Sequence, residues 1–106
     1  GSPGTGANQV YYPNGLFIDG NGNLYISEGG SDRVSKWAQG ATSGITVAGG
    51  NGQGSASNQL HDPLGIFVDN SGNVFISDEA NQRIQKWVPG ATSGITVAGG
   101  NGQGAA

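Results

Sequence analysis

The feature that most constrains this chain is an internal repeat. Residues 40–50 (GATSGITVAGG) return without change at residues 90–100, an offset of 50 residues. A repeat of this length is typical of propellers and solenoids, in which one unit cannot bury its hydrophobic face alone. Outside the identical block, the recurring residues are Pro13, Gly15, Phe17, Asp19, Gly22, Asn23, Ile26, Ser27, Arg33, Lys36 and Trp37, which return as Pro63, Gly65, Phe67, Asp69, Gly72, Asn73, Ile76, Ser77, Arg83, Lys86 and Trp87. We therefore expect two copies of one structural unit.

The composition predicts a folded chain that does not bind nucleic acid. Its 22 glycines and 4 prolines recur at fixed repeat positions between apolar runs, as expected for short strands joined by tight turns. Charged residues make up 10 % of the chain and the net charge is −3. The four cations (Arg33, Lys36, Arg83 and Lys86) recur in register and do not cluster, which argues against a surface that follows phosphates.

Three features that the sequence lacks bear on disulfides, membrane partners and targeting. The chain has no cysteine, so no disulfide framework is expected. No apolar stretch approaches the roughly 20 residues that a membrane helix requires, so we expect no membrane partner. The first residues lack a basic region followed by an apolar one, so we also expect no signal peptide.

The second copy shows the expected strands most clearly. Apolar, β-branched and aromatic residues predict strands at 65–69, 74–77, 83–88 and 95–98, separated by a turn at 70–73, a polar connection at 78–82 and a Pro-Gly break. Four short antiparallel strands per unit, with no helical periodicity, predict the blade of a β-propeller, and hence an all-β fold. We assign residues 1–50 to blade 1 with its preceding linker, 51–100 to blade 2 with its linker, and 101–106 to the start of a next linker. Leu60 is the expected anchor of the linker 51–62, and Val10 holds the matching place before blade 1.

Residues 63–87 (PLGIFVDNSGNVFISDEANQRIQKW) resemble an NHL repeat. The family's pattern runs Pro-x-Gly-apolar-x-Val-Asp, then Gly-Asn-apolar-aromatic-apolar-x-Asp, then Asn-x-Arg-Ile-x-x-aromatic. Residues 13–37 match as well, with Glu28 for the usual Asp and Ser31 for the usual Asn. The kelch family has units of similar length, but its Gly-Gly doublet before an aromatic residue appears once, at residues 29–30 ahead of Trp37, and the second copy has Glu79-Ala80 there.

The resemblance implies a propeller, usually of six blades, that binds proteins, RNA or small ligands; a minority of the family are metal-dependent lyases or hydrolases. Two blades cannot close a ring, since known propellers have about four to eight. We therefore predict a self-assembling, non-catalytic scaffold or binding platform in which three chains form a six-bladed ring. A dimer of four blades and a tetramer of eight are the alternatives. The repeated block suits an engineered sequence or a piece excised from a longer repeat array.

Ligand contacts, if any, are expected at the mouth of the central channel. Tyr11 and Tyr12 precede the first inner strand where the second copy has His61 and Asp62, so the two copies differ there. The alternative function is a ligand-binding or lyase-like propeller with its site in the channel. The single histidine argues against the lyase, because one chain cannot build a multi-histidine zinc site or a conventional hydrolytic triad.

No cofactor or metal is expected. Residues 19–23 (DGNGN) have oxygen side chains at alternate positions, but the sixth and twelfth places of an EF-hand loop hold Leu24 and Gly30. A hairpin turn explains this segment better. The Gly-rich residues 49–54 open no helix, so they do not fit a nucleotide-binding loop.

The remaining repeated residues are expected to be structural. Charged groups that recur in each blade fit turns and ion pairs, and we assign this role to Asp19, Glu28, Arg33, Asp69, Asp78 and Arg83. Aromatic residues at matching strand positions fit the core between adjacent blades, and we assign Phe17, Trp37, Phe67 and Trp87 to it.

Overall fold

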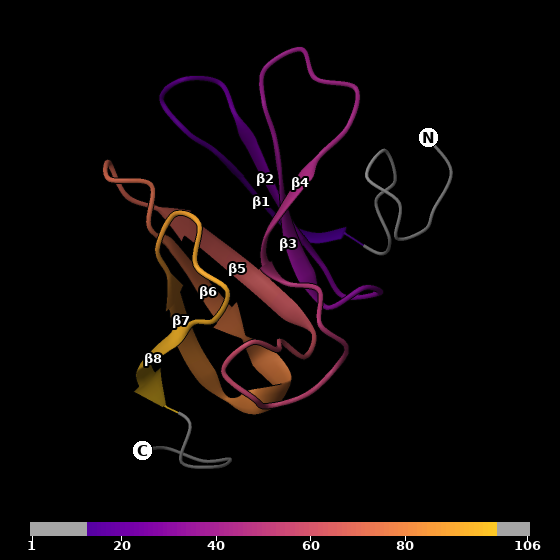
Figure 1. Cartoon of the computed structure of the whole chain (residues 1–106), viewed down its shortest axis with the longest axis vertical. Coiled ribbons are helices and arrows are strands. Elements are labelled where there is room, and N and C mark those ends of the chain that lie inside the picture. The colour runs from indigo at the N-terminus through magenta and orange to yellow at the C-terminus, as the bar shows by residue number, and fades with distance from the viewer. Residues whose placement is uncertain (1–12, 100–106) are drawn as a thin grey trace.

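The computed structural model describes residues 13–99, which form two four-stranded antiparallel sheets (Figure 1). The strands of blade 1 are β1 (Pro13–Ile18), β2 (Leu24–Glu28), β3 (Arg33–Trp37) and β4 (Ile45–Gly49). Those of blade 2 are β5 (Pro63–Val68), β6 (Val74–Asp78), β7 (Arg83–Trp87) and β8 (Ile95–Gly99). In each sheet the strands are ordered as in the sequence. The predicted all-β fold with two four-stranded blades is confirmed.

The strand positions agree closely with the hydrophobic pattern, and the connections add one element. The polar connection after β6 contains a single 3-10 turn, η1 (Glu79–Asn81), which the sequence pattern did not predict. Within residues 13–99 no helix has the length and apolar character needed to cross a membrane.

The two copies have the same strand register. In blade 1, Phe17 pairs with Tyr25 across β1 and β2; in blade 2, Phe67 pairs with Phe75 across β5 and β6. Each outer strand has one extra residue opposite the third strand, and in β4 this residue is Val47. Such a bulge lets two consecutive side chains lie over the same face of the sheet.

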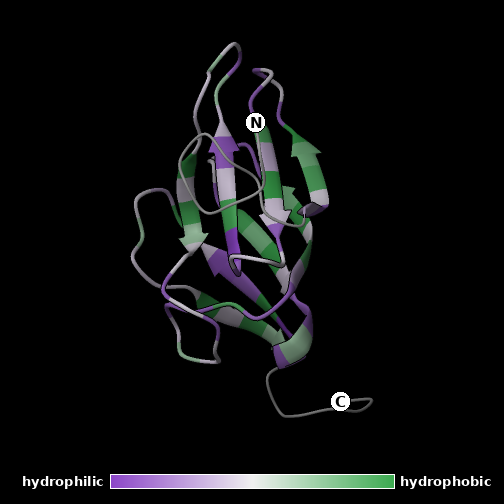
Figure 2. Ribbon diagram, turned by 90° about the vertical axis from the view of Figure 1, so that its right-hand side faces the viewer, coloured by the Kyte–Doolittle hydropathy of each residue, from purple (hydrophilic) through white to green (hydrophobic). Residues whose placement is uncertain are grey.

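Strand geometry divides the side chains of each blade between two faces, because successive residues point to opposite sides. We call face A the one that carries Phe17, Tyr25, Val34, Val47 and Ala48 in blade 1 and Phe67, Phe75, Ile84, Val97 and Ala98 in blade 2. Face B carries Leu16, Ile18, Leu24, Ile26 and Trp37 in blade 1 and Ile66, Val68, Val74, Ile76 and Trp87 in blade 2. Hydrophobic residues therefore occur on both faces of each sheet, and hydrophobic segments recur along the strands in Figure 2.

The blades stack with face A of blade 1 on face B of blade 2. The buried core consists of Tyr25, Val34 and Ala48 from the first, Val68, Val74, Ile76 and Trp87 from the second, and Leu60 from the linker. The innermost strands β1 and β5 lie next to each other, and β2 also contacts β5. The hydrophobic core of this chain is thus a single interface between two blades.

Candidate functional site

The faces that the stacking leaves uncovered are the main candidate site. On face B, Val68 of blade 2 is 7 % exposed, whereas its equivalent in blade 1, Ile18, is 62 % exposed. On face A, Ala48 of blade 1 is buried, and its equivalent Ala98 is exposed. At these two positions the repeat residue is buried where the other blade covers it and exposed where it does not.

The expected inter-blade aromatic core is only partly present in the single chain. Trp87 is 2 % exposed, and Phe17 packs against the core with its ring edge-on to Phe67 at 5.6 Å between centroids. In the single chain, Phe67 is 57 % exposed and Trp37 is half-buried. Both lie on faces that no blade of this chain covers, and burial of an aromatic ring requires that neighbour.

Polar groups fix the register between the two inner strands. The Ser27 hydroxyl, which is buried, donates to the Leu64 carbonyl at 2.6 Å. The Asn14 amide donates to the Asp62 carboxylate at 3.0 Å and to the Pro63 carbonyl at 3.2 Å. A Cβ at Gly15 would collide with the Leu64 carbonyl, so the close approach of β1 and β5 requires glycine at this position.

The predicted ion pairs lie at the start of each third strand. Arg33 Nε is 3.1 Å from Glu28 Oε2 in blade 1, and Arg83 Nε is 2.6 Å from Asp78 Oδ2 in blade 2. Both carboxylates are fully buried. A buried carboxylate of this kind needs its cation and further hydrogen bonds, because desolvation otherwise costs several kcal/mol.

In blade 2 the same arginine also holds the linker. Its guanidinium donates to three linker carbonyls, those of Ser55 (2.9 Å), Ala56 (3.1 Å) and Gln59 (2.8 Å). Beside it, the Asn81 amide donates to the Gly54 carbonyl. The linker 51–62 is thus tied to the blade that it precedes, and Figure 1 shows it looping past the end of that sheet.

Asp19 and Asp69 stabilise the hairpin turns between the first two strands of each blade. Asp19 accepts from the backbone N–H of Asn21 and Asn23 and from the Asn23 amide. Asp69 makes the same three hydrogen bonds, with Ser71 and Asn73. These bonds lower the pKa of both carboxyl groups, chiefly through the Asn23 N–H for Asp19 and the Asn73 side-chain amide for Asp69.

Two of the four predicted channel-mouth residues, His61 and Asp62, lie in the described part of the chain, and their backbone N–H groups are bound. The backbone N–H of His61 donates to Asp78 at 2.7 Å, and that of Asp62 donates to Asp32 at 2.9 Å. Tyr11 and Tyr12 lie outside the described residues. Within residues 13–99 no three His, Cys, Asp or Glu side chains are grouped so that they could hold a metal ion.

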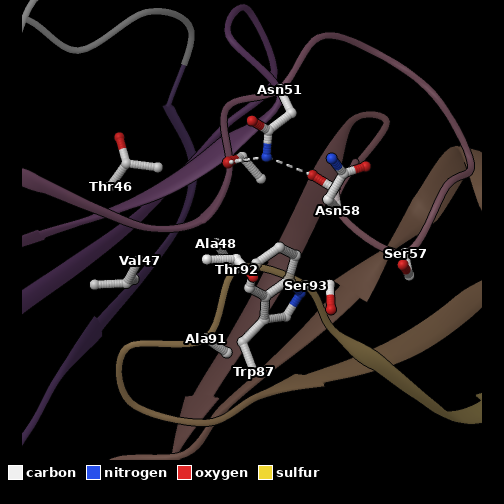
Figure 3. Close-up of a pocket in the computed structure, with 11 residues that line it drawn as sticks. Thr46, Val47, Ala48, Asn51, Ser57, Asn58, Trp87, Ala91, Thr92 and Ser93 are labelled. Atoms are coloured by element: carbon white, nitrogen blue, oxygen red, sulfur yellow. Dashed lines mark hydrogen bonds between the residues drawn. The ribbon is translucent and has the colours of Figure 1, made fainter.

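A groove of about 580 Å³ opens between the blades near their outer strands (Figure 3). Trp87 lines it together with Ala48 of β4 and Ala91 of the β7–β8 loop. Over the indole, the Asn51 side chain donates to the Gly49 carbonyl at 3.3 Å and to the Asn58 carbonyl at 2.8 Å. The indole Nε1–H donates to Gln85 Oε1 at 3.1 Å, so the Asn51 amide and the Trp87 indole both have partners within the chain.

Sequence reasoning missed several residues that join the blades. Asn14 and Asn81 each donate to a backbone carbonyl of a distant segment as well as to a carboxylate, and carbonyls leave no trace in a sequence pattern. Gln85 had a detectable signal: it is a polar residue in an otherwise apolar strand face next to Trp87, and it is 1 % exposed.

Comparison with known proteins agrees with the geometry of the blades. The sequence profile of the NHL repeat matches residues 60–87, which run from the linker anchor Leu60 to the end of β7. No curated protein matches the chain. The fold and this match define a chain of propeller-like blades, and residues 60–87 of it match an NHL repeat.

Proposed function

We propose that this chain is a non-catalytic, self-assembling propeller unit that serves as a scaffold or binding platform. Copies join head to tail, with face B of blade 1 in one copy covered by face A of blade 2 in the next. Three chains close a ring of six blades. The repeated block of residues 40–50 and 90–100 fits an engineered sequence or one excised from a longer array.

The observation that carries this proposal is the complementarity of the two uncovered faces. Inside the chain, face A already packs on face B, and the residues of both faces recur fifty positions apart with conservative changes. The uncovered pair therefore has the same chemistry as the pair that forms the core. Burying a large apolar side chain stabilises a contact by about 1.5–3 kcal/mol, so several such residues on each face favour association.

The symmetry of the contact follows from the two faces being different. A contact between unlike patches is heterologous and forms a closed ring when the rotation per unit allows it. With blades as the unit, closure at six requires three copies of a two-bladed chain. Closure at four or eight would require two or four copies.

A non-catalytic role is supported by how the ionisable groups are used. The buried carboxylates of Glu28 and Asp78 are paired with arginines, and those of Asp19 and Asp69 are bound in turns. Each of these four groups has hydrogen-bond or ion-pair partners within its own blade, which fits a structural role.

The experiment is the solution mass as a function of concentration, by sedimentation equilibrium or native mass spectrometry. The chain has a mass of 10.6 kDa, so the proposal predicts a species of about 32 kDa. A species of about 21 or 42 kDa would replace six blades by four or eight. A well-folded monomer at all concentrations would contradict self-assembly.

A further inference from the structure

Leu60 occupies a socket on face A of blade 1. Its side chain is fully buried and belongs to the same core cluster as Val34 and Ala48. Its Cδ1 lies against Gly49, within 2.9 Å of where a Cβ would stand on that glycine. Two residues later, the N–H of Asp62 donates to the Asp32 carboxylate, which fixes the segment as it enters β5.

The equivalent place on face A of blade 2 is a pocket of about 220 Å³. Its lining includes Gln82, Ile84, Ala98 and Gly99, which lie fifty positions after Asp32, Val34, Ala48 and Gly49. Ala98 and Gly99 are exposed, whereas their blade 1 counterparts are buried. None of the described residues plays the part here that Leu60 plays in blade 1.

We propose that this pocket receives Val10 from a second copy of the chain, and this rests on the head-to-tail assembly proposed above. Val10 lies outside the described residues, but it precedes β1 by the same three positions by which Leu60 precedes β5. In this arrangement, the segment that precedes blade 1 in the second copy fills the pocket on blade 2 of the first copy.

The sizes of the side chains support this occupant. Leu60 in the filled socket belongs to the same cluster as Val34, while the smaller Val10 would enter a pocket lined by the larger Ile84. Each pair contains one valine and one larger aliphatic residue, so the total volume is conserved, and volume-conserving exchanges are the ones that packed interfaces tolerate best.

The polar contact next to the socket is also compatible. In the chain, the Asp32 carboxylate accepts the N–H of Asp62. At the corresponding places are Gln82 and Tyr12 of the second copy, and a glutamine side-chain oxygen can accept a backbone N–H in the same way. Gln82 has the same left-handed backbone conformation as Asp32, with φ values of 53° and 50°.

The test compares Val10→Asp with Thr5→Asp, which adds the same charge five positions earlier in the sequence. Val10→Asp is expected to raise the dissociation constant of the assembly about tenfold or more, and Thr5→Asp to leave it close to wild type. Circular dichroism of each variant at low concentration checks that the blades remain folded.

A second measurement does not depend on a variant. In a mixture of labelled and unlabelled copies, isotope-filtered NOEs are expected between Val10 methyl groups of one copy and the methyl groups of Ile84 and Ala98 of another. If the wild-type chain assembles but shows no such NOEs, and Val10→Asp assembles as well as Thr5→Asp, the socket proposal is wrong and head-to-tail assembly stands. A monomeric wild-type chain overturns both.

Discussion

Face A of blade 1 and face A of blade 2 have nearly the same residues but differ in their exposure to solvent. In blade 1 the face is covered by the second blade, so Val34 is 0 % exposed and Ala48 is buried. In blade 2, Val97 is 50 % exposed and Phe67 lies in the open. The comparison teaches that the repeat encodes a surface that needs a neighbour on each side. Whether a given copy is buried depends on its place in the stack.

The hydrogen bonds of the equivalent serines Ser27 and Ser77 also differ between the two blades. Ser27 of blade 1 donates to the Leu64 carbonyl of the next inner strand, while Ser77 of blade 2 accepts from the Gly65 N–H of its own blade. Gly15 is pressed against the next blade, and Gly65 has only Ser77 near the position of a Cβ. Ser77 and Gly65 of blade 2 are therefore the groups that would form the same contacts with a further blade.

The largest loss of stability is expected from removing the Arg83 side chain, which holds the linker 51–62 against blade 2. Arg83→Ala leaves the buried Asp78 carboxylate without its cation and frees three linker carbonyls. Breaking one side of a buried ion pair costs about 3–5 kcal/mol, which we expect as the loss in the free energy of unfolding in urea. Lys86→Ala is the control, because this lysine lies over the Phe75 ring, a contact of about 0.5–1 kcal/mol, and is not part of the buried ion pair. Equal losses in the two variants would mean that Arg83 does not hold the linker.

The two equivalent glycines separate folding from assembly. Gly15→Ala is expected to destabilise the chain by about 1–3 kcal/mol, because the new methyl group meets a backbone carbonyl that cannot move aside easily. Gly65→Ala has its nearest neighbour at 3.7 Å, so the stability of the dilute chain should stay within about 0.5 kcal/mol of wild type. Gly65→Ala should nevertheless weaken association, since a further blade would approach it as β5 approaches Gly15.

Urea titrations of both variants, at low and high protein concentration, measure the two effects separately. If Gly65→Ala associates as strongly as wild type, blade 2 does not use this strand for the next contact. If Gly15→Ala is as stable as wild type, the close approach of β1 and β5 is not as described.

The smallest effect is a pH dependence that both blades share. The pKa values of Asp19 and Asp69 lie below the usual 3.8, so these carboxylates favour the folded state while they are ionised. Their contribution is complete above the unfolded value and is lost as the pH falls through the lower folded value. The urea midpoint should therefore decrease on acidification below about pH 4, and less so in Asp69→Asn. A midpoint that rises in this range, or an unchanged slope in Asp69→Asn, would contradict the turn assignment.

The blades themselves could be predicted from the sequence because their information is local. The identical block, the apolar strands and the Gly-Asn turns each act within a few residues, and β5 to β8 begin and end close to the predicted places. The roles of Asp69 and Arg83 were also accessible, since repetition in every blade indicates a structural group. The covered face was not predictable, because it depends on how many neighbours each copy has. The hydrogen bonds from Arg83 to the linker were not predicted for a different reason: their acceptors are backbone carbonyls, which any residue provides.

The most direct measurement of the central claim is a mixing experiment with two variants, each damaged on one uncovered face. Ile18→Asp places a charge on face B of blade 1, and Val97→Asp places one on face A of blade 2; both positions are exposed in the chain. If unlike faces pair, each variant alone should remain a monomer of 10.6 kDa, because it keeps only one type of intact face.

Mixed in equal amounts, the two variants should form a 1:1 complex of about 21 kDa by native mass spectrometry, joined through the two intact faces. Self-association of either variant alone, or a mixture that stays monomeric while the wild type assembles, would contradict head-to-tail pairing of the blade faces.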